Sequence, residues 1–120
     1  MEDVKLGVVE AKFADIIWEH EPITTKELVT LCDETLNWKR TTTYTVLKKL
    51  CNRGIFSTDN SIVSALISKE QFYAIQSEKF VEDIFQGSLP AFIAAFSKRK
   101  TLTSKEIKEI RDMIDSLEEE

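Results

Sequence analysis

The chain has 120 residues, which suits one domain or a small domain with an appendage. Hydrophobic residues make up 42% of it, enough for a packed core, and no apolar run approaches the roughly 20 residues of a membrane span. The start, Met1 to Lys5, lacks the basic and apolar parts of a secretory signal. We therefore expect a cytoplasmic protein without membrane insertion.

The net charge of −5 is unevenly distributed along the chain. From Lys39 to Arg53 there are five basic residues and no acid, whereas the segment from Glu106 to Glu120 holds seven acids and two bases. An acidic protein is in general a poor partner for nucleic acid. An acid-free basic block in such a protein therefore indicates a specific role for that block.

The sequence offers neither a set of metal ligands nor a catalytic constellation. Cys32 and Cys51 are far apart and His20 is the only histidine, whereas a structural zinc site needs about four closely spaced ligands. A Ser or Cys nucleophile needs a His beside it, and His20 has no Gly-rich nucleophile turn to serve; the three glycines form no phosphate-binding loop. We expect no metal, no cofactor and no enzymatic activity, with the cysteines free and buried and His20 at a solvated helix end.

Apolar residues at helical spacing predict a first helix over about residues 7–18, and Pro22 ends the run that follows it. Thr24 and Glu27 have the spacing of a capping box, which predicts that a short second helix begins there. The mostly polar stretch 33–37 predicts a turn.

A third helix is expected from about Arg40 to Asn52, with Gly54 where a helix end favours a left-handed residue. Threonine occupies four of the positions 41–45 and is a poor helix former. Hydroxyl groups at the start of a helix suit contacts with phosphates and base edges. The expected buried face of this helix holds Val46, Leu47, Leu50 and Cys51.

Two short apolar runs follow, at 55–56 and 62–67, and the residues between them, 58–61, are typical of a turn. We expect a β-hairpin here. Between Ser57 and Ala65 it has no basic residue and one acid, Asp59, so its contacts with phosphate should be weak or absent.

The last third of the chain is predicted to be helical. Capping boxes begin at Ser68 and Thr103, Gly87-Ser88 interrupts the first of these helices, and Pro90 suits the first turn of the next. Apolar residues in the final helix recur at spacings of three and four, as along a coiled-coil seam. Because short helices have no core of their own, we expect pairing across a two-fold axis through Leu89, Phe92, Ile93, Phe96, Ile107, Ile110, Ile114 and Leu117.

Three helices followed by a hairpin are the order of a winged helix-turn-helix, in which the third helix enters the major groove of DNA. The fold class expected is therefore mainly α with a small β-hairpin: a winged helix-turn-helix over residues 1–68, and a helical dimerisation arm over 69–120. We expect Trp18 and Trp38 to belong to the core. The predicted DNA contacts are Lys39, Arg40, Thr41, Thr42, Tyr44, Thr45 and Lys48.

These segments also carry a family resemblance. Residues 13–18, 24–28 and above all 38–50 with Arg53-Gly54 resemble the penicillinase repressors. The likeness spans about residues 7–117 and is most specific between Trp38 and Gly54. It implies a dimeric repressor that binds a palindromic operator in double-stranded DNA.

In the antibiotic-responsive members, the resemblance further implies a membrane sensor protease that cuts the repressor before a Phe. The equivalent bond here is Ala95–Phe96, and Ala95 departs from the Asn usual at that place. Copper-responsive members have a C-terminal cysteine cluster, whereas this chain has no cysteine after Cys51.

A second class of function stays open. Winged helices also serve as protein–protein adaptors, and a net charge of −5 with a wing that lacks basic residues would suit an adaptor. Salt-dependent retention on DNA distinguishes the two functions, because a protein that contacts several phosphates loses affinity steeply as salt rises.

Overall fold

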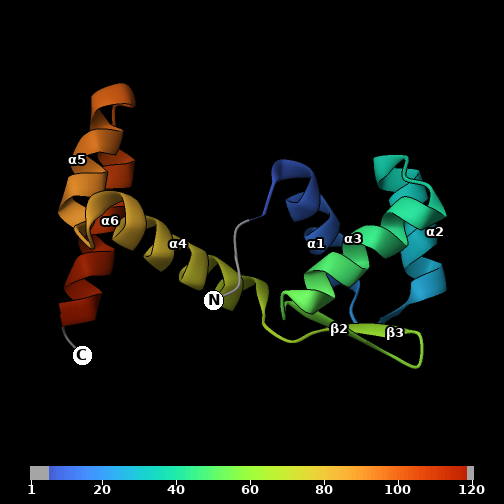
Figure 1. Cartoon of the computed structure of the whole chain (residues 1–120). Helices are drawn as coiled ribbons and strands as arrows, with labels where there is room; N and C mark the ends of the chain where they lie inside the picture. The colour runs from blue at the N-terminus through green and yellow to red at the C-terminus, as the bar shows by residue number, and fades with distance from the viewer. Residues whose placement is uncertain (1–5, 119–120) are drawn as a thin grey trace. The chain divides into compact units, whose positions relative to one another are not determined.

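The computed structural model describes residues 6–118, which form two compact units. The first unit ends at Glu78 and the second begins at Lys79, within one helix. Figure 1 shows the elements in chain order. They are α1 (Val8–His20), β1 (Ile23–Thr24), α2 (Thr25–Leu36), α3 (Arg40–Asn52), β2 (Phe56–Asp59), β3 (Ile62–Ala65), α4 (Lys69–Phe85), α5 (Leu89–Arg99) and α6 (Ser104–Glu118).

The helix-turn-helix pair is α2 and α3, and the turn between them is shorter than the sequence suggested. The prediction of a turn over 33–37 was wrong for its first four residues, because α2 continues through Leu36. Leu28 and Cys32 are buried and Leu36 is half-buried, so an apolar stripe at spacings of four holds this turn of helix against the core. The helix ends at Asn37, whose φ of 56° and ψ of 39° are left-handed.

The sheet has three antiparallel strands in the order β1-β3-β2. The predicted hairpin of β2 and β3 is confirmed, and its tight turn places Asn60 and Ser61 at φ values of 51° and 63°. Two successive left-handed residues match the twist of the flanking strands. Sequence analysis missed β1, whose residue Ile23 pairs with Val63.

The core of the first unit joins all of its helices to the sheet. Residues with no exposed surface come from α1, α2, α3, β2, β3 and α4, and they include Phe13, Ile17, Leu28, Leu50, Phe56 and Phe72. Both tryptophans pack against this core, as expected. The Trp38 ring stacks on that of Phe13 with 5.3 Å between centroids.

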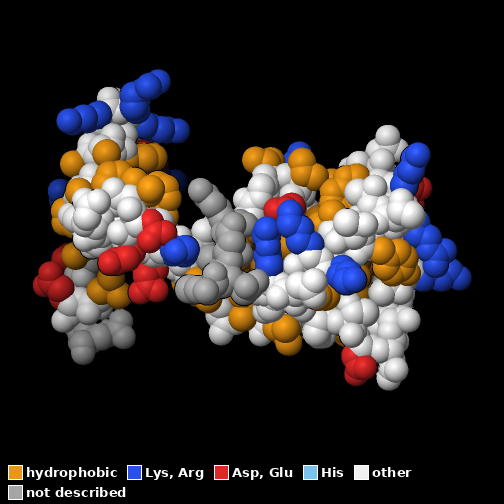
Figure 2. All heavy atoms as spheres, in the orientation of Figure 1, with side chains coloured by type: hydrophobic (Ala, Val, Ile, Leu, Met, Phe, Trp, Pro, Cys, Tyr) orange, Lys and Arg blue, Asp and Glu red, His pale blue; other side chains and the backbone are white. Residues whose placement is uncertain are grey.

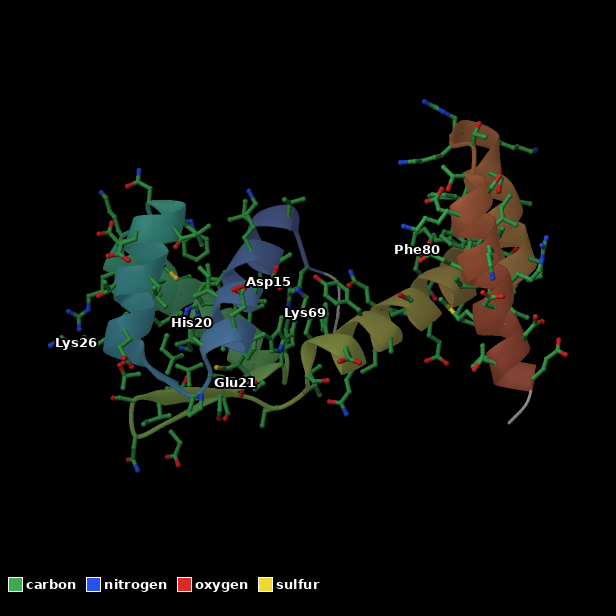
Figure 3. All side chains as sticks on the ribbon, turned by 180° about the vertical axis from the view of Figure 1, so that it is seen from behind. Asp15, His20, Glu21, Lys26, Lys69 and Phe80 are labelled. Carbon is green, nitrogen blue, oxygen red and sulfur yellow. The ribbon has the colours of Figure 1, made fainter. Side chains whose placement is uncertain are left out.

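The start of α4 is part of this core. The indole of Trp18 donates a hydrogen bond to the Ile67 carbonyl at 3.1 Å, and its ring lies 5.7 Å from that of Phe72. The Lys69 ammonium lies 2.9 Å from a carboxylate oxygen of Asp15 of α1; both side chains are labelled in Figure 3. The first turns of α4 therefore belong to the first compact unit. The division of the chain into a DNA-binding domain, 1–68, and a dimerisation arm, 69–120, stays a prediction.

All three predicted capping boxes are confirmed. The hydroxyls of Thr24, Ser68 and Thr103 accept from the amide three residues on, at 3.0–3.1 Å. In each case the side chain of that third residue accepts from the capping residue's own amide. These reciprocal bonds satisfy backbone groups that a helix start leaves without partners.

The second unit has a different construction. No residue of α5 or α6 is buried. Its best-packed part is a group of aromatic rings, Phe80, Phe85, Phe92 and Phe96, with neighbouring centroids 5.6–6.2 Å apart. Among residues 6–118, no helix combines the length and the apolar composition needed to cross a lipid bilayer.

Candidate nucleic-acid interface

The predicted DNA contacts lie on one exposed surface, formed by α3 and the residue before it. Thr43, Leu47 and Leu50 face the core, as one side of an amphipathic helix. Figure 2 shows Lys and Arg side chains over this part of the first unit. All seven predicted contacts are exposed, and we call them the α3 face: Lys39, Arg40, Thr41, Thr42, Tyr44, Thr45 and Lys48.

The buried side of α3 differs from the predicted one, which held Val46, Leu47, Leu50 and Cys51. Val46 and Cys51 are half-buried, whereas Thr43 is only 1% exposed and belongs to the core. Its hydroxyl donates to the Lys39 carbonyl at 3.3 Å, so the buried oxygen has a partner. Burial also raises the pKa of the Cys32 thiol, and a hydrogen bond with Thr43 opposes that rise.

One threonine of the α3 face, Thr45, bonds back to its own helix. Thr45 donates to the Thr41 carbonyl at 2.9 Å, the bond to the carbonyl four residues earlier that a threonine inside a helix can form. With its hydrogen engaged there, the Thr45 side chain presents a methyl group and oxygen lone pairs to an incoming ligand. Both suit base edges, since thymine carries a methyl and adenine and cytosine carry amino donors.

Tyr44 connects the two helices of the motif. The Arg40 guanidinium carbon lies 5.6 Å from the centroid of its ring, within the range of a cation–π contact. A hydrogen bond with Thr25, the first residue of α2, lowers the pKa of Tyr44; burial opposes this, and Arg40 adds to the lowering. Sequence analysis missed Thr25, because the two residues belong to different helices and no local spacing along the chain links them.

Two of the five bases between Lys39 and Arg53 form ion pairs within the first unit. Lys49 and Arg53 both turn to Glu10 of α1, with N–O distances of 2.6 and 3.8 Å. The hydrogen bond from Lys49 lowers the pKa of Glu10 most, the Gly7 amide adds to it, burial opposes it, and the charges of both bases contribute. These contacts brace α3 against α1, a role that the sequence did not reveal.

The other three bases, Lys39, Arg40 and Lys48, form no ion pair with any residue in the described range. They belong to the α3 face, and they are the groups left to attract phosphate.

The wing adds no positive charge. Its strands and turn carry hydroxyl groups and the exposed acid Asp59, and Ser57 and Ser64 lie 3.4 Å apart across the two strands. Exposed Ile62 is the wing's only large apolar side chain with much free surface, at 43%. Phosphate contacts therefore have to come from other elements.

The remaining polar candidates have local structural roles. His20 is exposed at the end of α1, where its Nδ1 lies 2.8 Å from the Ile16 carbonyl. Both cysteines are free; Cys32 is buried and Cys51 is half-buried. Within residues 6–118, no group of three or more His, Cys, Asp or Glu side chains is arranged to hold a metal ion.

The residues predicted for dimerisation are divided between the surface and a shallow interior. Phe92, Ile93 and Ile110 are half-buried within the single chain. Sequence analysis missed exposed Phe80, Ile84 and Met113 as further apolar surface. The predicted residues that remain exposed are Leu89, Phe96, Ile107, Ile114 and Leu117, at 40–64%.

The predicted cleavage bond, Ala95–Phe96, lies inside α5. Both residues are exposed, Phe96 at 47%. A protease that needs an extended substrate reaches this bond only when the surrounding turn of helix opens.

Comparison with known proteins matches a family described as penicillinase repressor to residues 6–116. A penicillinase repressor of Bacillus licheniformis is 22% identical over 92% of this chain and 90% of its own. A penicillinase repressor of Staphylococcus aureus is 21% identical over 95% and 94%. The methicillin resistance regulatory protein MecI of Staphylococcus aureus strain Mu50 is 20% identical over 92% and 93%. Since the family match covers nearly the whole chain, the protein belongs to the penicillinase repressor family, whose members are transcriptional regulators and not enzymes.

Proposed function

We propose that the protein is a homodimeric repressor that binds a palindromic operator in double-stranded DNA through the α3 face. The observation that carries this proposal is the composition of that face: exposed threonines with Lys39, Arg40 and Lys48 and no acid among them. In a chain of net charge −5, such a surface is suited to a polyanion.

The chemistry of five residues of the face suggests a role for each. Thr42 and Thr45 are three residues apart and share one side of the helix, where they would approach base edges. Arg40, at the entry of the helix, suits either a guanine edge or a phosphate. Lys39 and Lys48 suit phosphates, which position a protein on DNA without specifying sequence.

The dimer would place two such faces on two half-sites. A C2 dimer and a palindromic site share the same symmetry, so each protomer makes the same contacts. The exposed apolar residues of α5 and α6 provide the surface that would be buried between protomers.

An inverted repeat upstream of the protein's own gene is the natural operator to test. Arg40→Ala should weaken binding to it by about 1–3 kcal/mol if the guanidinium makes a bidentate base contact. Fluorescence anisotropy at fixed salt measures the change. Thr30→Ala, an exposed position on α2 outside the α3 face, is the matched control. Unchanged affinity for Arg40→Ala and for Lys48→Ala would refute the assignment of α3.

The adaptor alternative is supported by one observation, the wing without basic residues. A pure adaptor would show no DNA retention at any salt, whereas a repressor would lose its retention as salt rises. Retention of the full chain on a duplex, followed across a salt gradient, distinguishes the two.

Release from DNA would come from weakening the dimer. A cut at Ala95–Phe96 would separate α6 from the DNA-binding unit and remove the avidity of two linked half-sites, which reaches about 10²–10⁴-fold. A fragment ending at Ala95 should therefore bind the operator far more weakly than the full chain at equal salt. Equal affinities would exclude this mode of release.

A further inference from the structure

A second group of basic residues lies where α5 ends and α6 begins. Lys98 and Arg99 are in the last turn of α5, Lys100 caps that helix, and Lys105 is in the first turn of α6. All four are exposed, and none forms an ion pair within the described part of the chain. We call these four residues the arm-tip cluster.

The charges of the second unit are segregated. Figure 2 shows Lys and Arg side chains gathered at one end of this unit and acidic side chains away from that end. No acid occurs between Asp83 and Glu106, while the second half of α6 carries Asp112, Asp115 and Glu118. The basic end is therefore a continuous segment of the chain, 98–105.

The helix dipoles explain why some, but not all, of the four bases occupy these positions. Cations in the last turn of a helix interact favourably with its dipole, which accounts for Lys98 and Arg99. The same dipole disfavours Lys105 in the first turn of α6, and Lys100 adds a fourth like charge. A group of unpaired charges that the fold does not require indicates a ligand of opposite charge.

The nearest acid does not neutralise the cluster. Glu106 accepts from the Thr103 amide at 2.9 Å as part of the capping box. Its pKa is lowered first by that backbone hydrogen bond, then by the Thr103 hydroxyl, with a smaller contribution from the charge of Lys100. Lys100 thus lies near Glu106, but one carboxylate that is already hydrogen-bonded leaves most of the positive charge open.

The α3 face has little charge for a DNA-binding surface. Glu10 engages Lys49 and Arg53, and the wing has no base, so the unpaired bases of the face are Lys39, Arg40 and Lys48. Phosphate contacts supply a large share of the affinity of most DNA-binding proteins. The arm-tip cluster holds more unpaired bases than the face itself.

We propose that the arm-tip cluster binds the phosphate backbone of duplex DNA, as a second DNA contact besides the α3 face. The inference rests on the proposed function, because a duplex held by α3 raises the effective concentration of phosphate for the rest of the chain. The cluster carries no sequence information, since Lys and Arg bind phosphates alike on any sequence. It raises affinity and its salt dependence for all duplexes.

Two variants of the full chain with the same change in net charge test this. One is Lys98→Gln with Arg99→Gln and Lys100→Gln. The control is Lys79→Gln with Lys108→Gln and Arg111→Gln, which removes three bases from the same unit; two of them are already paired, with Asp83 and Asp112. Binding to a duplex of random sequence is measured by fluorescence anisotropy over a range of salt concentrations.

The arm-tip variant should bind on the order of tenfold more weakly at low salt, with a flatter salt dependence. The slope of log affinity against log salt should fall by about 0.9 for each phosphate that the variant no longer neutralises. The control should stay close to wild type. A charge-conserving variant, Lys98→Arg with Arg99→Lys and Lys100→Arg, should bind as wild type, and circular dichroism should give all three variants the same helix content.

The failures of the two proposals are distinguishable. If wild type binds no duplex at any salt, the proposed function and the inference both fail. If wild type binds and the arm-tip variant matches the control, the inference alone is overturned. It is also overturned if the arm-tip variant keeps its DNA affinity but loses binding to phosphatidylserine vesicles, because the cluster then serves an anionic membrane surface.

Discussion

The two units of this chain differ in how far their apolar side chains are buried. In the first unit, side chains from α1, α2, α3, β2, β3 and α4 are fully buried around one core. In the second, neither α5 nor α6 has a buried residue, and Ile114 and Leu117 are 46% and 64% exposed. The first unit has the construction of a domain that folds alone, whereas the second leaves apolar side chains exposed that the proposed dimer would cover.

The largest effect should come from the second unit. Ile110→Asp together with Ile114→Asp should give monomers in which the first unit stays folded, because burial in the proposed dimer would make each Ile contribute roughly 1.5–3 kcal/mol and a carboxylate buried there would oppose association. Sedimentation measures the mass, and near-ultraviolet dichroism reports the packing of Trp18.

The control for that variant is Ser116→Asp, which adds an acid on the opposite side of α6 at helical spacing. It should remain dimeric. A wild-type chain that sediments as a monomer at micromolar concentration would contradict the account of the second unit.

The corresponding change in the first unit is Phe13→Ala. Phe13 is fully buried and stacks on Trp38, so its loss should cost about 3–5 kcal/mol of unfolding free energy. Urea unfolding at constant protein concentration measures this. Val8→Ala, at a position 76% exposed, is the control, and equal costs for the two would mean that the core is wrongly described.

Neighbouring lysines of α3 allow a sharper comparison. Lys48→Ala should weaken binding to every duplex and flatten the salt slope by about one, because it would remove a proposed phosphate contact. Lys49 pairs with Glu10, so Lys49→Ala should change DNA binding little and stability by at most about 1 kcal/mol. The reverse pattern in anisotropy titrations would show that the α3 face is misplaced.

One capping box in each unit gives a smaller effect. Thr24→Ala removes the cap of α2 and should lower the unfolding free energy by about 1 kcal/mol. Thr103→Ala removes the equivalent cap of α6, and should weaken dimerisation instead, as measured by sedimentation at several concentrations. Identical effects of the two variants on both measurements would contradict the division of roles.

The smallest effect should be a pH dependence from Glu10. Its pKa in the folded chain lies below the ordinary value of 4.5, so its contribution is present above that value and is lost as pH falls through the folded pKa. Glu10→Gln should therefore have unfolding free energy that depends less on pH in the acid range. An unchanged acid limb in unfolding curves would contradict this.

Local features of the fold were predictable from the sequence, and features set by distant pairing were not. Spacing and capping residues gave the helices because both act within a few residues. The strand β1 has two residues and exists through its pairing with β3, which no local pattern signals. The end of α2 was misplaced because polar residues 33–35 suit a turn and an exposed helix face equally well.

The candidate site shows the same division. The exposed face of α3 follows from helical periodicity, so its residues could be named in advance. That Lys49 and Arg53 pair with Glu10, and that Thr25 lowers the pKa of Tyr44, depends on how α1 and α2 pack against α3. The count of five bases between Lys39 and Arg53 therefore overstated the positive charge available to DNA, because two of them pair with Glu10.

The most direct test of the account compares wild type with Ile110→Asp/Ile114→Asp on two duplexes, one with a single half-site and one with the full inverted repeat. Anisotropy titrations at equal salt should give both proteins the same affinity for the half-site. On the full site, wild type should bind about 10²–10⁴-fold more tightly than the variant, because two linked faces act together. Equal affinities on the full site would contradict a repressor whose second unit joins two α3 faces.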